Sequence, residues 1–201
     1  MADYKASPDE IKQLRTMTGA GMLDCKNAIE QFTGNLEKAK EELRKKGLAI
    51  VSKKASRGAC DGLIHAYIHH NAKTGVLVEI NCETDFVART PDFRTLVEEV
   101  AMHIAANPAS QWITKDEVPP EAVEAEKEIY RGQIADSGKP PQVVEKILEG
   151  KLKKFYSEVC ILDQPWVKDD KKTIRDLMNE VIAKVGENIV LRRFSRFQIG
   201  E

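Results

Sequence analysis

The chain has 201 residues, of which 42% are hydrophobic and 31% are charged, and its formal net charge is −1. This balance excludes a disordered chain and argues against a general nucleic-acid binder, because such a protein carries an excess of Lys and Arg. The length accommodates one large domain or two small ones. No Cys-x-x-Cys pair occurs among the four cysteines, which predicts reduced thiols in a cytoplasmic protein: Cys25, Cys60, Cys82 and Cys160.

Neither a secretory signal nor a membrane span is expected. The first five residues, Met1 to Lys5, lack the apolar stretch of a signal peptide. No run of the chain approaches the roughly 18 apolar residues that a membrane span requires. We therefore expect no membrane partner.

The first predicted helix begins at Ser7. Ser7 can cap the first turn, Pro8 suits that turn, and Glu10 completes a capping box. Ile11 and Leu14 then share one face at i, i+3 spacing, and the glycines that follow Thr18 break the helix.

Two more helices complete a small predicted bundle in residues 1–47. The second carries the apolar residues Leu23, Ala28, Ile29 and Phe32. The third has Asn35 as its N-cap and is expected to end at Gly47. The core of this three-helix bundle is small, so the stability of the bundle should be marginal.

Residues 48–58 are interpreted as a basic linker with some helical character. Lys53, Lys54 and Arg57 lie there among small residues. These charges are either a solvated surface or an aid to faster association with an acidic partner.

Two strands and a helix are predicted next. The strands span residues 63–70 and 75–82, and a turn-rich segment of hairpin length joins them. The helix buries one face and ends at Asn107-Pro108. Its apolar residues are Phe93, Leu96, Val97, Val100, Met102, Ile104 and Ala105.

A helical hairpin is predicted at about residues 120–159. Its first helix runs to about residue 135, a tight break occupies residues 137–141, and a partner helix follows from about Gln142. The first helix is unusually polar, as in helices that project into solvent or bridge between bodies.

The C-terminal part is predicted as a turn, a helix and a strand. Pro165-Trp166 marks the turn, and the helix begins at Ile174 and stops at Gly186. Residues 188–198 carry bulky side chains on both faces of a strand, the third of an antiparallel sheet. The predicted fold class is α+β, with helices packed on a small three-stranded sheet.

The segment Glu83-Thr84-Asp85-Phe86-Val87-Ala88-Arg89 lies at the predicted strand-to-helix junction. Asp85 and Phe86 should therefore lie on the surface, held by rigid elements on both sides. Phe86 either folds back into its own core or forms an apolar wedge beside a carboxylate, suited to entering a partner. Cys82 is interpreted as a small buried hydrophobe, because no His is singled out as its base.

Other motifs are too incomplete to predict catalysis or metal binding. Gly19-x-Gly21 has no third glycine at the needed spacing and no preceding strand. His65 and His69 would lie about 13 Å apart on a strand, at roughly 3.3 Å per residue, which is too far to share one metal. The lysines at 151, 153 and 154, beside Phe155 and Tyr156, are interpreted as a solvated helix face with buried rings. We expect no catalytic residues, no metal and no cofactor.

Two ordered motifs, residues 81–88 (Asn-Cys-Glu-Thr-Asp-Phe-Val-Ala) and residues 14–26 (Leu-Arg-Thr-Met-Thr-Gly-Ala-Gly-Met-Leu-Asp-Cys-Lys), resemble the bacterial elongation factor Ts family. The resemblance covers essentially the whole chain, in the family's short form. It implies a ubiquitin-associated-like three-helix domain at 1–47, a basic linker at 48–58, and a core dimerisation-type domain at 59–201 whose helical hairpin protrudes.

The resemblance implies a guanine nucleotide exchange factor for the GTPase elongation factor Tu, without enzymatic activity of its own. It binds the GDP form and promotes GDP release by disrupting the magnesium and phosphate site. Phe86 would wedge between partner helices and Asp85 would fix the shifted backbone. Thr84 and Val87 would hold the shape of this partner-binding motif.

The N-terminal motif implies a second contact through Arg15, Met22 and Lys26. Met22 is alternatively part of the bundle core, since methionine fills gaps readily. His103 matches a further family motif and either touches the partner or lies only in the core.

Two expectations concern assembly and function class. Longer relatives carry two related core halves and this chain has one, which predicts a homodimer, a two-plus-two complex, and contact through Ile189 to Phe197. The alternative function is an adaptor whose bundle binds peptides or helices, which predicts no role for Asp85 or Phe86. Neither hypothesis involves direct nucleic-acid binding.

Overall fold

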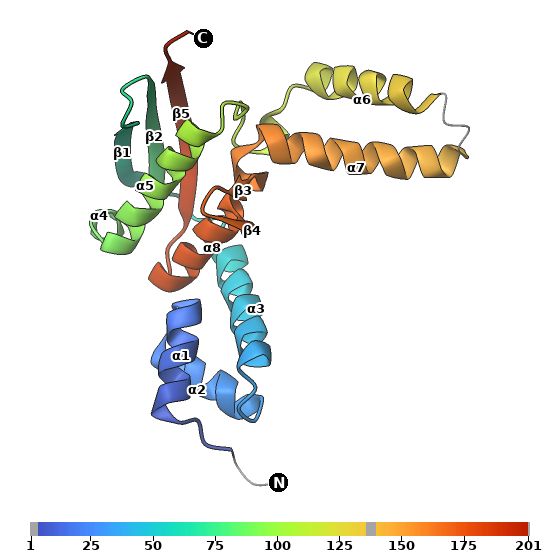
Figure 1. Cartoon of the computed structure of the whole chain (residues 1–201). Helices are drawn as coiled ribbons and strands as arrows, with labels where there is room; N and C mark the ends of the chain where they lie inside the picture. Colours follow the sequence, from blue (N-terminus) through green and yellow to red (C-terminus); the bar gives the residue numbers. More distant parts are fainter. Residues whose placement is uncertain (1–3, 136–139, 201) are drawn as a thin grey trace. The chain divides into compact units, whose positions relative to one another are not determined.

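The computed structural model describes residues 4–135 and 140–200, and its fold class is α+β, as predicted (Figure 1). It contains an antiparallel three-stranded sheet in the order β1-β2-β5 and a separate β3-β4 pair. The chain forms two compact units. The first comprises residues 1–65, 78–98 and 176–192, and the second comprises residues 66–77, 99–175 and 193–201.

The first helix, α1 (Pro8–Thr18), has the predicted capping box. The hydroxyl of Ser7 accepts a hydrogen bond from the Glu10 amide at 3.2 Å, and the Glu10 carboxylate accepts one from the Ser7 amide at 2.8 Å. Gly19 closes the helix with a φ of 67°, and its amide donates to the Arg15 carbonyl. Because φ is positive there, a residue with a side chain would be strained.

Helices α2 (Met22–Gln31) and α3 (Leu36–Lys54) complete the three-helix bundle, with Asn35 as the predicted N-cap of α3. The fully or nearly buried core side chains are Leu14, Cys25, Ala28, Ile29, Ala39 and Leu43. Leu23, one of the apolar residues that the predicted second helix carries, lies outside this core and is 69% exposed. The reason is helical phase: Cys25, not Leu23, precedes Ala28 and Ile29 by three and four positions.

The predicted end of the third helix at Gly47 is wrong. Helix α3 continues to Lys54, through more than half of the expected linker. A glycine inside a helix costs only about 1 kcal/mol, and a Cβ on Gly47 would lie in ordinary contact with the Cβ of Ala183, at 3.4 Å. Arg44 also pairs with Asp176 at 3.2 Å.

The predicted sheet is present as β1 (Asp61–Ile68), β2 (Thr74–Cys82) and β5 (Ile189–Gln198). Gly62 adopts a φ of 141°, and a Cβ there would lie only 2.2 Å from the Ile80 carbonyl oxygen. Glycine is therefore required for the close approach of β1 to β2. Alternate residues of β2 are buried, as expected for a strand with one covered face: Val76, Val78, Ile80 and Cys82.

Three helices lie close in sequence to these strands. Helix α4 (Asp85–Ala88) and helix α5 (Pro91–Ala106) follow β2, and α8 (Ile174–Val185) precedes β5. The predicted stop of α8 at Gly186 is confirmed: the Gly186 amide donates to the Ile182 carbonyl at 2.9 Å, and its φ is 74°.

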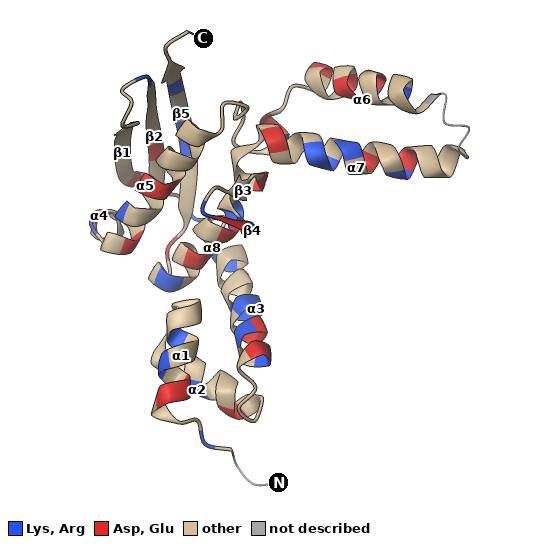
Figure 2. Ribbon diagram, in the orientation of Figure 1, with Lys and Arg blue, Asp and Glu red and all other residues tan. Residues whose placement is uncertain are grey.

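The predicted helical hairpin is formed by α6 (Pro120–Ala135) and α7 (Pro141–Val159), which lie side by side (Figure 1). Acidic residues predominate on α6, and most of the basic residues of the hairpin lie on α7 (Figure 2). The part of the predicted break at residues 137–139 lies outside the described residues. A short 3-10 helix (Lys115–Glu117) precedes α6, and the described helices include none long and apolar enough to cross a membrane.

The β3-β4 pair was not predicted. Pro165–Trp166 (β3), expected as a turn, pairs antiparallel with Asp169–Thr173 (β4), after the 3-10 helix Ile161–Asp163. Four of the five β4 residues are Asp or Lys, and such residues have low strand propensity. The pairing therefore depends on tertiary context that the local sequence does not reveal.

Candidate functional site

The motif at residues 81–88, here called the central motif, has an exposed tip formed by Asp85 and Phe86. This tip projects from a short helix. Phe86 is the second residue of α4, and its side chain is 77% exposed, so the interpretation that it folds back into the core is wrong. The opposite face of α4, formed by Val87 and Ala88, is the buried one. Asp85 lies beside Phe86, and its carboxylate pairs with Arg89 at 2.7 Å. The exposed tip thus combines a large apolar ring with a carboxylate.

Thr84 braces the base of the tip. Its hydroxyl accepts a hydrogen bond from the Val87 amide at 3.4 Å, which caps α4. The same hydroxyl donates to one carboxylate oxygen of Glu187 at 2.7 Å, and the Thr84 amide donates to the other at 3.1 Å. Both polar groups of one residue are therefore held by a single carboxylate.

Glu83 makes a reciprocal contact with the segment that carries Glu187. Its carboxylate accepts a hydrogen bond from the Asn188 amide at 2.7 Å and meets the Arg57 guanidinium at 3.4 Å. The hydrogen bond from Asn188 is the main reason that the pKa of Glu83 lies below its ordinary value. Asn188 is buried, and its side-chain amide donates to the Arg57 carbonyl at 2.8 Å.

The buried side of the motif fixes its shape. Val87 is buried, so its side chain is not available for direct contact with a partner, and its role in holding the motif's shape stays a prediction. The Val87 carbonyl accepts a hydrogen bond from the Thr90 hydroxyl at 2.7 Å. Burial raises the pKa of the Cys82 thiol to about 11, which agrees with a packed hydrophobe and not with a nucleophile.

The N-terminal motif presents a second exposed surface at the junction of α1 and α2. Met22 is 63% exposed, so its interpretation as bundle core is wrong. Arg15 and Lys26 are exposed as well, and Lys26 pairs only loosely with Glu30 at 3.9 Å. Met17 and Leu23 add exposed apolar area that sequence reasoning did not assign to this surface. The signal that could have found them is the same motif, in which both residues lie.

Lys184 of α8 lies beside the N-terminal motif and pairs with the start of α5. Its ammonium pairs with Asp92, the second residue of α5, at 2.5 Å. Its Cδ lies 3.9 Å from the position that a Cβ on Gly19 would occupy. Both motifs belong to the first compact unit.

His103 lies in the core of the second unit. Its side chain has no exposed area, and its Nε2 donates to the Gln164 side-chain oxygen at 2.8 Å. Burial lowers the pKa of His103, so the neutral ring is favoured. The predicted alternative of a partner contact is therefore wrong for this conformation, and the core alternative holds.

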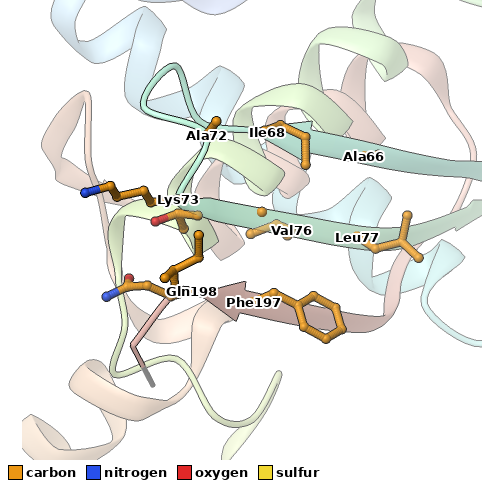
Figure 3. A pocket seen from close by; sticks show the side chains of 11 residues that line it. Ala66, Ile68, Ala72, Lys73, Val76, Leu77, Phe197 and Gln198 are labelled. Carbon is orange, nitrogen blue, oxygen red and sulfur yellow. The ribbon is translucent and has the colours of Figure 1, made fainter.

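A third exposed region, here called the apolar sheet face, lies in the second unit. It consists of Ile68, Leu77, Phe197 and Ile199, all of them exposed. These residues line a hollow of about 400 Å³ together with the β1-β2 turn (Figure 3). Ile68 and Leu77 come from neighbouring strands, while Phe197 belongs to β5.

Sequence reasoning missed the residues that brace the tip. Glu187 and Arg57 lie 103 and 26 residues from their respective partners in the motif. No local pattern distinguishes them from other surface charges. Within residues 4–135 and 140–200, no group of three or more His, Cys, Asp or Glu side chains is arranged to hold a metal ion.

Comparisons with known proteins agree with this arrangement of motifs. The family model described as Elongation factor TS matches residues 5–201. Elongation factor Ts of Fervidobacterium nodosum is 57% identical over 195 residues, which cover 97% of this chain and 98% of that protein. The relatives from Caldanaerobacter subterraneus subsp. tengcongensis and Anaeromyxobacter sp. are 55% and 54% identical, over 97% and 100% of this chain and 97% and 90% of their own lengths. The chain therefore belongs to the elongation factor Ts family of translation elongation factors.

Proposed function

We propose that this chain is a guanine nucleotide exchange factor that binds elongation factor Tu in its GDP form and promotes GDP release. The proposal rests mainly on the exposure of Phe86. Its side chain is 77% exposed on a short helix that is capped by Thr84. A large apolar side chain held out in this way is unfavourable in water and suited to insertion into a partner. Asp85 accompanies it and fixes the displaced partner backbone.

The energy available from Phe86 is a large share of what exchange requires. Burial of a Phe side chain supplies about 1.5–3 kcal/mol, whereas a thousand-fold faster release corresponds to about 4 kcal/mol. The remainder comes from the second contact, formed by Arg15, Met22 and Lys26, all of which are exposed. Insertion near the magnesium site removes ligands from the metal and the phosphates, and no bond of the nucleotide is broken. The chain is thus proposed to act in the cytoplasm as a binding protein and not as an enzyme.

We propose that successive segments of the chain have separate roles. Residues 1–47 form the ubiquitin-associated-like domain with the second contact, residues 48–58 connect it, and residues 59–201 form the core domain with the tip. Helix α3 extends through the connecting segment as far as Lys54, so the connection is proposed to be stiff over most of its length.

We further propose that two copies associate through the apolar sheet face, giving a two-plus-two complex with elongation factor Tu. Phe197 and Ile199 are 71% and 74% exposed, and Ile68 and Leu77 lie in the same hollow (Figure 3). A two-fold axis through this face would cover the same residues on both copies, which is the commonest symmetry of protein oligomers. No cysteine lies in β5, so the association is proposed to be non-covalent.

Release of labelled GDP from purified elongation factor Tu, with and without this chain, tests the exchange function. The proposal expects release to accelerate with the concentration of the chain until it saturates. An unchanged rate at saturating chain would contradict the exchange function and favour the adaptor alternative, in which Phe86 has no role.

A further inference from the structure

The contacts around the base of the tip assign a function to a residue outside both motifs. We propose that Glu187 is a positioning residue, which holds the turn at Thr84 so that Phe86 points outward before a partner is met. The effect on nucleotide release rests on the proposed exchange function, whereas the effect on the turn itself does not. The inference is carried by hydrogen bonds within the first compact unit.

Glu187 lies on a rigid platform. It follows Gly186, which ends α8 with a positive φ and a hydrogen bond to Ile182. It precedes Asn188, which is buried and tied to Glu83 and Arg57. The backbone on both sides of Glu187 is therefore fixed by contacts that do not involve Thr84 or the side chain of Phe86.

The carboxylate of Glu187 determines which way the Thr84 hydroxyl is turned. That hydroxyl donates to Glu187 and at the same time accepts from the Val87 amide, so its one proton and one of its lone pairs are both used. The Thr84 amide is held by the second carboxylate oxygen. These contacts fix the start of α4, and the direction of Phe86 follows from the start of α4.

A tip fixed in advance costs less ordering free energy when it enters a partner. Glu187→Ala removes both acceptors and leaves Thr84 free to turn. We expect about a ten-fold fall in the maximal rate of GDP release, since each 1.4 kcal/mol of lost preorganisation corresponds to a factor of ten. The concentration of chain that gives half-maximal release should change little, because the second contact, around Met22, is untouched.

The conservative variant Glu187→Gln distinguishes the effect of the hydrogen bonds to Thr84 from the effect of the negative charge. Glu187→Gln keeps an oxygen that accepts from the Thr84 amide and gains an amide group that can donate to the Thr84 hydroxyl oxygen. It should therefore restore most of the rate. Glu98→Ala, a change to an exposed carboxylate on α5 of the same unit, is the matched control and should leave the rate unchanged.

The test combines hydrogen exchange at the Thr84 amide with GDP release from elongation factor Tu, for the full chain and its Glu187→Ala, Glu187→Gln and Glu98→Ala variants. Positioning predicts that Glu187→Ala increases exchange at the Thr84 amide, leaves exchange at core amides such as Val97 unchanged, and slows release. Unchanged exchange at Thr84 would overturn the bracing role, and faster exchange with normal release would overturn the positioning role. Slow release in Glu187→Gln despite a protected Thr84 amide would show that charge and not position matters, which also overturns it. Should the wild-type chain fail to accelerate release, the exchange function fails, and the amide result alone decides whether Glu187 holds the turn.

Discussion

Phe86 and Phe197 are exposed by 77% and 71%, yet they belong to two different kinds of surface. Phe86 stands almost alone on a four-residue helix, with a carboxylate beside it and a hydrogen-bonded base below. Phe197 lies in the apolar sheet face with Ile68, Leu77 and Ile199. A narrow projection is suited to entering a partner, whereas a broad apolar face is suited to covering a second face like itself. Similar exposure of two phenylalanines thus indicates different kinds of contact, because the side chains around each one differ.

A substitution in the apolar sheet face should have the strongest effect of those considered. Phe197→Asp places a carboxylate in the proposed interface of each copy, and the symmetry brings in two such charges at once. Burial of unpaired charges is so unfavourable that the dissociation constant of the homodimer should rise by about 100-fold or more. Light scattering at micromolar concentration should then change from about twice 22.6 kDa to 22.6 kDa. A wild-type chain that is already monomeric, or a variant that stays dimeric, would contradict the assignment of this face.

The next effect is on the narrow tip. Phe86→Ala removes about 1.5–3 kcal/mol of burial in the partner, which corresponds to roughly a 10- to 100-fold slower maximal release of GDP. The mass of the chain and its unfolding temperature should not change, because the ring contributes little to its own core. Ile129→Ala, which removes another exposed apolar side chain from α6, serves as the control. Normal release by a folded Phe86→Ala variant would eliminate the wedge.

A smaller effect is expected at the second contact. Met22→Ala removes exposed apolar area that is proposed to become partly covered, worth roughly 1 kcal/mol, or about a five-fold rise in the half-saturating concentration of the chain. The maximal rate should stay close to that of the wild type. Titration of GDP release with each variant therefore separates the two contacts. Phe86→Ala should lower the maximal rate (the plateau), whereas Met22→Ala should raise the half-saturating concentration of the chain (the midpoint). An effect of Met22→Ala on the plateau alone would contradict this division.

The smallest effect is expected for Arg89→Ala. Its ion pair with Asp85 is exposed on both sides, and such pairs contribute less than about 1 kcal/mol. GDP release should change by less than about five-fold, and the change should shrink further as salt screens the pair. Complete loss of release would instead mean that Arg89 contacts the partner directly.

The parts of the fold that were predictable are those determined by neighbours in sequence. The capping box at Ser7, the N-cap at Asn35 and the stop at Gly186 depend on residues within one helical turn, and all three are confirmed. Gly47 shows the limit of this reasoning, because a glycine costs only about 1 kcal/mol inside a helix and does not by itself end α3, which continues to Lys54. The β3-β4 pair likewise has no local pattern that predicts it.

The sequence predicted which residues form the candidate site, but it did not predict which residues hold them in place. The motifs located Phe86 and Met22, while their exposure had to be seen in the structure, since an apolar side chain on a short helix is compatible with either burial or projection. Glu187 could not be found at all from the sequence. Its role arises only because the end of α8 lies next to Thr84, and tertiary contacts of this kind leave no periodic signal.

We propose that the tip competes with bound nucleotide, and calorimetry of the chain with elongation factor Tu measures this competition. If the chain lowers the affinity of elongation factor Tu for GDP, then GDP must lower the affinity for the chain by the same factor, because the two binding free energies are linked. We expect tight binding to the nucleotide-free protein, much weaker binding after GDP and magnesium are added, and a smaller difference between the two for Phe86→Ala. Equal affinity of the wild-type chain for the nucleotide-free and GDP-bound proteins would mean that the tip and the nucleotide do not compete.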